Sequence, residues 1–308
     1  MRIVFMGTPE FAVPSLEGLV GAGHQLAGVF SQPDRPVGRH HNKLQPTPVK
    51  ERALAHGIPV YQPETLRDGT ALAILQELDP ELIVVAAYGR FLPDEILALP
   101  SKGCINVHSS LLPKYRGSAP INWAILNGER VTGVTIQRMV RDMDAGDILL
   151  QQAVKIGKTE DAAALYDRLA QLGGELAVEA VAQIQAGTAT YTPQDHTQAT
   201  QAPMLSKAMS PVDWTRSAQE IFNQIRGLYP WPGASTTAIT GEPIKLWGAQ
   251  VVEKHTDAGP GTIVAAGKQG IDVACGEFNH VLRILELQPP GKKRMTAAAY
   301  LAGHPIQV

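Results

Sequence analysis

The sequence predicts an α/β domain followed by a small all-β domain. The chain has 308 residues, more than a single hydrophobic core usually holds, so two domains are expected. In the first half, short apolar runs alternate with helix-like stretches, which indicates a mostly parallel, Rossmann-like sheet covered on both faces. In the last third, short strand-like runs are separated by turn residues, which indicates a small β-barrel of OB-like type.

The first-half elements follow from their apolar runs and from the residues that end them. A helix is predicted over residues 14–23, because Pro14 suits a first helical turn and Gly23 suits a C-terminus. Ligands of such sheets bind beyond the carboxyl ends of the strands, so chemistry is expected just after the strands. Buried strands are predicted over residues 3–6, 25–30, 81–87 and 104–108.

A long amphipathic helix closes the first domain. Thr159 is the predicted N-cap, with acidic residues in the following turn. Its apolar residues recur at helical spacing and predict a face packed on the sheet: Leu165, Leu169, Leu172, Leu176, Ala180 and Ile184.

The chain after this helix loses its periodicity. Residues 187–206 are rich in Thr, Gln, Ala and Pro and predict a linker. The expected organisation is a first domain over 1–188, a linker over 189–206 and a second domain over 207–308. Three tryptophans of the second domain are expected in its core: Trp214, Trp231 and Trp247. The second domain should hold a helix over 218–226 and strands over 244–247, 262–265, 271–274 and 281–287.

Composition favours an ordinary globular protein. Hydrophobic residues make up 44% of the chain and charged residues 18%, and no apolar run is long enough to span a membrane. With no evident signal peptide and only Cys104 and Cys275, a cytoplasmic setting is expected. The net charge of −2 argues against a protein that coats nucleic acid.

One segment departs from this average. Residues 35–52 carry five basic side chains against the single acid Glu51, and they also contain His40 and His41. A charged loop is usually just solvated, but this one follows a predicted strand at the edge where a site should lie. Its basic residues are Arg35, Arg39, Lys43, Lys50 and Arg52.

The densest chemical signal lies at the end of the strand over 104–108. Asn106 and His108 are two residues apart and should project from the same face. An amide can stabilise an oxyanion and an imidazole can move a proton, so the pair suits acyl transfer. Spacing alone favours an ordinary strand end that contains a hydrogen-bonded histidine, because N-x-H is a short and common pattern.

A second candidate is the acidic turn over residues 142–147. Its three aspartates around a glycine, Asp142, Asp144 and Asp147, could present one carboxylate into a cleft, although a solvated turn is the commoner case. No spacing typical of metal ligands accompanies it, so no metal is expected. The first strand is not followed by Gly-x-Gly-x-x-Gly, which disfavours a dinucleotide.

Residues 106–117 resemble the signature of the folate-dependent formyltransferases, which reads N-x-H-x-S-x-L-P followed by an aromatic residue, a basic residue and glycine. The similarity extends over nearly the whole chain. Further matching segments are residues 31–36, 87–89, 144–147, 229–232 and 290–293.

The resemblance implies a reaction and its central residues. The donor would be 10-formyltetrahydrofolate, and the acceptor would be the α-amino group of methionine on initiator methionyl-tRNA. Asn106, His108 and Asp144 would be the catalytic residues, without a metal. The first domain would bind folate and the second would bind tRNA, in a protein that acts as a monomer.

The resemblance also implies the residues that bind each substrate. For Phe91 and Leu92, simple packing on the core is an equal alternative to folate contact. The folate site would comprise Ser110, Leu111, Leu112 and Pro113 together with Tyr88, Gly89, Arg90, Phe91 and Leu92. The acceptor arm of the tRNA would meet Arg35, Arg39, Lys43, Lys292 and Lys293.

Two other functions stay open at this level. A related formyltransferase could act on an amino sugar or another small amine. An RNA-binding module without catalysis is the alternative from another class, although the intact set of Asn106, His108 and Asp144 argues against it. Residues 38–43 read GRHHNK where relatives are typically shorter and richer in lysine, which leaves the details of tRNA recognition open.

Overall fold

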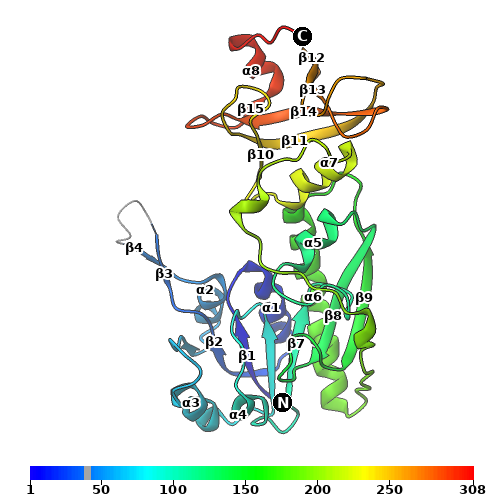
Figure 1. Cartoon of the computed structure of the whole chain (residues 1–308). Coiled ribbons are helices and arrows are strands. Elements are labelled where there is room, and N and C mark those ends of the chain that lie inside the picture. The colour runs from blue at the N-terminus through cyan, green and yellow to red at the C-terminus, as the bar shows by residue number, and fades with distance from the viewer. Residues whose placement is uncertain (38–42) are drawn as a thin grey trace. The chain divides into compact units, whose positions relative to one another are not determined.

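The computed structural model describes residues 1–37 and 43–308 (Figure 1). The chain divides into two compact units, which are described separately below. Unit 1 comprises Met1–Pro120, Val131–Lys155 and Tyr166–Ala202, and unit 2 comprises Ile121–Arg130, Ile156–Leu165 and Pro203–Val308. Across the described ranges, no helix is long and apolar enough to cross a membrane.

Unit 1 contains a seven-stranded sheet of order β5-β2-β1-β6-β7-β8-β9. The pairs from β5 to β7 are parallel, whereas β7–β8 and β8–β9 are antiparallel. The α/β prediction with a mostly parallel sheet is therefore confirmed. The strands are β1 Arg2–Gly7, β2 Gln25–Phe30, β5 Val60–Tyr61, β6 Leu82–Ala86, β7 Cys104–His108, β8 Val131–Arg138 and β9 Ile148–Lys155.

Helices cover both faces of this sheet. On one face, Leu75 of α3 packs in a cluster with Met6 of β1 and Val85 of β6. On the other face α6 approaches closely, because a Cβ on Gly173 would lie 2.8 Å from Val107 of β7. The helices are α1 Val13–Gly21, α2 Pro48–Ala55, α3 Thr70–Leu78, α4 Asp94–Leu97 and α6 Ala162–Ala186, with a 3₁₀ turn at Glu10–Ala12.

The predicted start of the long helix is wrong. Thr159 was the expected cap, but α6 begins at Ala162. The Asp161 carboxylate accepts a hydrogen bond of 2.8 Å from the Ala164 amide and so occupies the capping position instead.

The basic segment is not a single loop, because it begins with two paired strands and ends in helix α2. Strand β3 (Arg35–Val37) pairs antiparallel with β4 (Lys43–Gln45), and the hairpin extends from the body of unit 1 after β2 (Figure 1). Both strands are short, and the exposed Leu44 lies in the second of them.

The segment expected to be a linker lies against unit 1 as far as Ala202. The amide and carbonyl of Thr192 exchange 2.8 Å hydrogen bonds with those of Ile148, and Gln201 forms a bridge with Arg116. Polar contacts hold this segment, so hydrophobic periodicity could not reveal them. The domain boundaries themselves stay a prediction.

Unit 2 contains an antiparallel sheet of order β10-β11-β14-β13-β12, with β15 added to β14. This confirms a C-terminal antiparallel β domain. Among the strands described, no pairing joins β10 to β12 at the two ends. The elements are α5 Pro120–Leu126, α7 Ala218–Gly227, α8 Ala297–Gly303, β10 Ala234–Thr236, β11 Ile244–Glu253, β12 Ile263–Gly267, β13 Gly270–Ala274, β14 His280–Gln288 and β15 Met295–Thr296, with 3₁₀ turns at His196–Gln198 in unit 1 and Lys207–Met209 in unit 2.

The core of unit 2 explains where its apolar residues lie. Ile221 and Ile225 of α7 pack with Leu246 of β11 and Ile284 of β14. The expectation for the tryptophans is wrong at Trp231, which is 51% exposed. Trp214 and Trp247 are half-buried, and their indole N–H groups donate to Thr236 and Gln288.

Candidate active site

Asn106 and His108 occupy the carboxyl end of the central strand β7. Alternation along the strand puts both on the face that also carries Cys104. Cys104 packs in the same apolar cluster as Tyr88 and Leu92, so the loop after β6 lies on this face too. The sheet thus brings the predicted catalytic pair and the predicted folate loop to one side.

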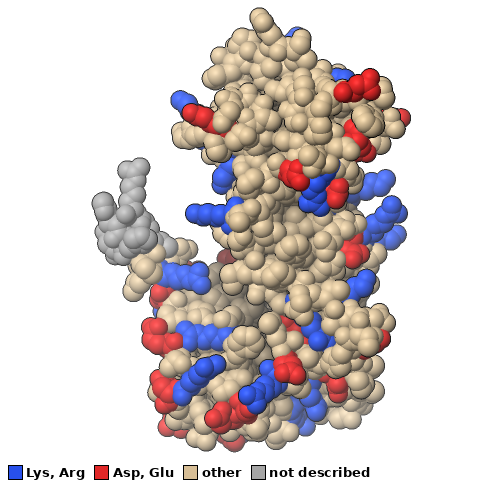
Figure 2. Space-filling view, in the orientation of Figure 1, with Lys and Arg blue, Asp and Glu red and all other residues tan. Residues whose placement is uncertain are grey.

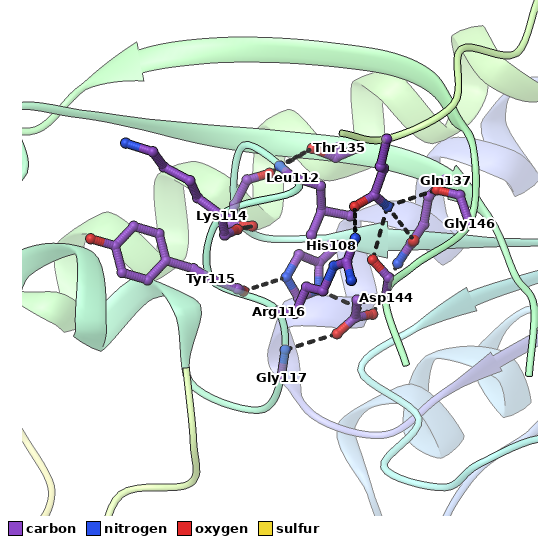
Figure 3. A network of polar contacts seen from close by, with 12 residues as sticks. His108, Leu112, Lys114, Tyr115, Arg116, Gly117, Thr135, Gln137, Asp144 and Gly146 are labelled. Carbon is purple, nitrogen blue, oxygen red and sulfur yellow. Dashed lines mark hydrogen bonds and ion pairs between the residues drawn. The ribbon is translucent and has the colours of Figure 1, made fainter. Parts of the chain in front are cut away.

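His108 is held from two directions (Figure 3). Its side chain is buried, and the Nε2–H group donates a 2.9 Å hydrogen bond to the Tyr115 carbonyl. Nδ1 lies 3.6 Å from Oδ1 of Asp144. Both ring nitrogens therefore face oxygen atoms. Nε2 is committed to a carbonyl, so proton exchange with a substrate would use Nδ1.

Asp144 is presented by a tight turn between β8 and β9. Its φ of 52° lies in the left-handed region, which is unusual for a residue other than glycine. Its Oδ2 accepts a 2.9 Å hydrogen bond from the Gly117 amide, and its Oδ1 accepts one of 2.9 Å from the Gln137 amide group. The turn is so close to β8 that a Cβ on Gly146 would lie 1.7 Å from the Arg138 carbonyl oxygen.

The three side chains therefore differ in how they are engaged. Within the described residues, no side-chain hydrogen bond is recorded for the half-buried Asn106, whereas His108 and Asp144 are fixed by neighbours. An amide donor beside an imidazole–carboxylate pair is equipped to stabilise a developing oxyanion and to move a proton. The structure brings the three predicted catalytic residues into one site.

The loop after β7 is stabilised by its own polar groups. Ser110 is fully buried, and its hydroxyl donates a 2.7 Å hydrogen bond to the Lys114 carbonyl. The Thr135 hydroxyl donates to the Ser110 carbonyl at 2.6 Å and accepts from the Leu112 amide at 3.2 Å. Leu112 is buried, whereas Leu111 and Pro113 are half-buried. Ser110 and Leu112 thus shape this loop from within.

The loop after β6 has alternating exposure. Tyr88 and Leu92 are buried, Gly89 and Phe91 are exposed, and Arg90 is half-buried. Burial raises the pKa of the Tyr88 hydroxyl to about 12.

Gln32 fixes the backbone of this loop. Its side-chain amide donates a 3.1 Å hydrogen bond to the Tyr88 carbonyl, and its Oε1 accepts one of 3.0 Å from Arg90. Gly89 has a φ of 82°, so the turn favours a residue without a side chain at this point.

A pocket of about 550 Å³ opens beside the loop after β6. Phe91 and Leu92 line it, as do the guanidinium-bearing side chains of Arg67 and Arg141. Its volume is in the range typical of small-molecule sites, about 300–1,000 Å³. The lining does not include Asn106, His108 or Asp144, so the pocket is separate from the candidate centre.

The predicted tRNA-binding residues occupy different places. Arg35 is exposed on β3, and Lys292 and Lys293 are exposed in the turn after β14. Lys43 lies on β4, paired with Val37, and Arg39 lies outside the described residues. On the face shown in Figure 2, Lys and Arg are interspersed with Asp and Glu.

Two basic residues of the same segment are already paired within unit 1. Lys50 donates to Asp34 at 2.6 Å and to Gln62 at 2.8 Å, and Arg52 lies 3.6 Å from Glu17. Hydrogen bonds from Gln62 and Lys50 hold the pKa of Asp34 below its ordinary value. These two cations support the fold locally, in contrast to Arg35.

Sequence reasoning missed a group of polar residues around the site. Gln137, Gln151 and Gln194 each hydrogen-bond to a loop of the site. Glutamine has no signature spacing, so no pattern in the sequence distinguishes these three from exposed ones. In the part of the chain that the structure describes, no group of His, Cys, Asp and Glu is suited to hold a metal ion.

Two family models match the chain. The model described as formyl transferase covers residues 1–181. The model described as formyl transferase, C-terminal domain, covers residues 204–305.

Curated relatives match over the full length. The chain is 49% identical to the methionyl-tRNA formyltransferase of Alkaliphilus oremlandii (strain OhILAs), over 100% of this chain and 98% of that protein. It is 46% identical to the methionyl-tRNA formyltransferase of Bacillus subtilis (strain 168), over 99% of this chain and 96% of that protein.

Solved structures share the fold at low identity. The N-formyltransferase from Helicobacter canadensis, in complex with folinic acid and dTDP-3-aminofucose, superposes with a TM-score of 0.67 at 17% identity, over 92% of this chain and 99% of that one. HypX from Aquifex aeolicus in complex with tetrahydrofolic acid gives a TM-score of 0.63 at 19% identity. This chain is covered to 98%, but it spans only about half, 47%, of HypX.

Proposed function

The chain belongs to the formyltransferase family, and on this basis we propose that it transfers the formyl group of 10-formyltetrahydrofolate to the α-amino group of methionine on initiator methionyl-tRNA. The product is N-formylmethionyl-tRNA, the form used to begin translation. One observation carries the choice of acceptor: relatives named methionyl-tRNA formyltransferase match at 46–49% identity over the full length, including the second unit.

The reaction makes definite demands on the site. An α-amino group has a reference pKa of about 7.7–8.0, so it must lose a proton before it attacks the formyl carbon. The attack produces a tetrahedral oxyanion, and the folate nitrogen departs more readily once it is protonated. The site must therefore donate hydrogen bonds to one oxygen and move protons between two nitrogens.

We assign these tasks to the three residues at the end of β7 and in the turn after β8. Asn106, whose amide is not engaged by the described residues, donates to the oxyanion. His108 exchanges the proton through Nδ1, because Nε2 is bound to the Tyr115 carbonyl. Asp144 holds the imidazole at 3.6 Å and stabilises its charged form.

Folate is proposed to bind on the face of the sheet that carries the loop after β6. Backbone groups of residues 88–92, fixed through Gln32, suit a flat heterocycle rich in donors and acceptors. The adjoining pocket combines the apolar Phe91 and Leu92 with Arg67 and Arg141, and such guanidinium groups pair well with carboxylates of the donor. Residues 110–113 are proposed to contact the folate from the loop after β7.

The acceptor arm of the tRNA is proposed to meet the β3–β4 hairpin and the turn after β14. Arg35, Lys292 and Lys293 are exposed cations in these places, and Lys43 belongs to β4. Arg39, the fifth residue of this proposal, lies outside the described residues. If about three phosphates are neutralised, log affinity should fall with log salt at a slope of roughly −2 to −3. A Michaelis constant for tRNA that does not change with salt would contradict these contacts.

The decisive experiment offers competing acceptors. The protein is incubated with 10-formyltetrahydrofolate and initiator methionyl-tRNA, and formation of the N-formylmethionyl ester is followed. Parallel reactions contain elongator methionyl-tRNA, glycinamide ribonucleotide or a nucleotide-linked amino sugar. Rapid formylation of the initiator alone supports the proposal, whereas transfer only to a small amine would overturn the tRNA assignment and keep the formyl-transfer chemistry.

We also propose that the protein acts as a cytoplasmic monomer. Its acceptor is a translation substrate, and both cysteines are buried thiols, whose pKa values burial raises to about 12 for Cys104 and about 11 for Cys275. Light scattering of the purified chain should give one mass near 33.0 kDa. A stable dimer would contradict this part of the proposal.

A further inference from the structure

Gln194 lies in the irregular segment after α6, and its side chain is turned inward. It is only 6% exposed, although its sequence neighbours on both sides are exposed. Its amide group donates hydrogen bonds of 2.8 Å to the Asp144 carbonyl and 2.7 Å to the Gly146 carbonyl. Both carbonyls belong to the turn that presents the catalytic carboxylate.

The carbonyl end of the same side chain reaches the opposite loop. Gln194 Oε1 accepts a 2.7 Å hydrogen bond from the Arg116 guanidinium. Arg116 lies between Tyr115, whose carbonyl accepts from His108, and Gly117, whose amide donates to Asp144. One side chain thus connects the loop that fixes the imidazole to the turn that fixes the carboxylate.

Backbone contacts set the position of Gln194. On one side, Thr192 and Ile148 exchange two hydrogen bonds of 2.8 Å. On the other side, the Thr200 hydroxyl accepts from the Tyr115 amide at 2.9 Å, and the Thr200 carbonyl accepts from the Arg116 amide at 2.8 Å. The segment is therefore anchored before and after the glutamine, and both anchors are on unit 1.

The conformation of Asp144 explains why such support is needed. Its φ of 52° is costly for a residue with a side chain, and conformations of this kind persist only where the surroundings enforce them. Two hydrogen bonds to the carbonyls of residues 144 and 146 fix two peptide planes of the turn, Asp144–Ala145 and Gly146–Asp147. The direction of the Asp144 carboxylate follows from those planes.

We propose that Gln194 is a positioning residue, which keeps the Asp144 carboxylate directed toward His108 during formyl transfer. It contacts neither substrate in this assignment and acts only through Asp144 and the loop after β7. The inference rests on the proposed function for the identity of the reaction, but the geometry that carries it does not depend on the acceptor.

Three variants separate hydrogen bonding from packing. Gln194→Ala removes the side chain, and Gln194→Met keeps its approximate volume without hydrogen bonds. Both should lower kcat by about 10- to 100-fold and leave the Michaelis constant for 10-formyltetrahydrofolate within about threefold, because a displacement of the reacting groups by about 1 Å can cost about 10²-fold. Gln198→Ala is the control, since Gln198 is exposed and donates only to Asp195; it should retain wild-type kcat.

A double-mutant cycle distinguishes positioning from general support of the fold. In an Asp144→Ala background, single-turnover rates should change by less than about threefold when Gln194→Met is added, because the carboxylate that Gln194 positions is absent. Full additivity of the two losses would overturn the proposal, as would a kcat of Gln194→Met within about threefold of wild type. Failure of both Gln194 variants to fold would assign the residue a structural role instead.

The result is separable from the proposed function. The wild-type rate with initiator methionyl-tRNA tests the function. The inference depends only on ratios between variants, which can be measured equally with another amine that the protein formylates.

Discussion

Two shielded aspartates, the buried Asp272 of unit 2 and the half-buried Asp144 of unit 1, are held in opposite ways. In unit 2, Asp272 lies between two cations: Arg283 donates to it at 2.6 and 3.0 Å, and Lys254 donates at 3.2 Å. In unit 1, Asp144 receives hydrogen bonds only from the neutral Gly117 amide and the Gln137 side chain. The single ionisable partner recorded for Asp144 among the described residues is His108.

The difference is the one expected between a structural carboxylate, Asp272, and a carboxylate proposed to act in catalysis, Asp144. Burial acts to raise the pKa of Asp272, but the hydrogen bonds and charges of Arg283 and Lys254 outweigh burial and lower this pKa. The charge of Asp272 is thereby paired with cations and stabilises the contact between β13 and β14. The neutral donors around Asp144 fix the direction of its carboxylate and bring no opposite charge to it. The negative charge of the carboxylate can therefore interact with His108.

The largest effect is expected at the residue that completes the unit 1 site. Asn106→Ala should lower kcat by about 10²–10³-fold, since removal of one oxyanion donor costs about 2.7–4 kcal/mol in the transition state. The free energy of unfolding should change little, because Asn106 is half-buried. Initial-rate kinetics with both substrates saturating would check this, and a loss of less than about tenfold would refute the assigned role.

Asp144→Asn tests the working carboxylate directly. It keeps the shape but removes the charge that faces His108, and kcat should fall by about 10²-fold, at the low end of what general acid–base catalysis contributes. Urea unfolding should give a midpoint close to that of wild type. An unfolding midpoint that falls strongly while kcat is retained would show that Asp144 is the structural carboxylate, contrary to this prediction.

Asp272→Asn should give the converse result. The side chain of Asp272 is 3% exposed, so two cations would lose a buried partner, and the free energy of unfolding should drop by about 1–3 kcal/mol. The kcat should stay within about twofold of wild type. Glu286→Gln, which removes a more exposed ion pair with Arg294, is the control and should cost no more than about 1 kcal/mol.

The smallest expected effect is a pH dependence of the unfolding free energy that Asp272 contributes. A carboxyl group with a lowered folded-state pKa stabilises the fold above its unfolded pKa, about 3.9, and this contribution disappears as the pH falls through the lower folded value. The difference in unfolding free energy between wild type and Asp272→Asn should be constant from about pH 5 to 7 and shrink below about pH 4. Urea titrations across this range check it, and an unchanged difference at about pH 3 would contradict the charge-based explanation.

The sequence predicted the strands that are apolar throughout. β1 and β6 are almost wholly buried, and unbroken apolar runs such as Leu82–Ala86 therefore predict a sheet that is covered on both faces. The antiparallel β8 and β9 and the β3–β4 hairpin went unassigned. β9 is partly exposed and the hairpin strands are short. β8 is buried except at its two ends, but threonine, glycine and glutamine interrupt its apolar run.

The candidate site was predictable to a different extent. Asn106 and His108 could be placed on one strand face from spacing, whereas Asp144 joined them only through the family resemblance. The roles of Gln137 and Gln194 in the site could not be predicted, because a glutamine that hydrogen-bonds to a loop produces no periodic pattern in the sequence. The assignment of the substrate-contacting residues stays a prediction until the kinetics are measured.

The packing of the segment after α6 has a practical consequence for dissecting the molecule. A fragment that ends at residue 188, the predicted edge of the first domain, would lack the Thr192, Gln194 and Thr200 contacts that brace the catalytic loops. A fragment that ends at Ala202 would keep all three, and that residue is also where unit 1 ends. Subcloning the catalytic half should therefore follow the hydrogen bonds of this segment rather than the end of the last long helix.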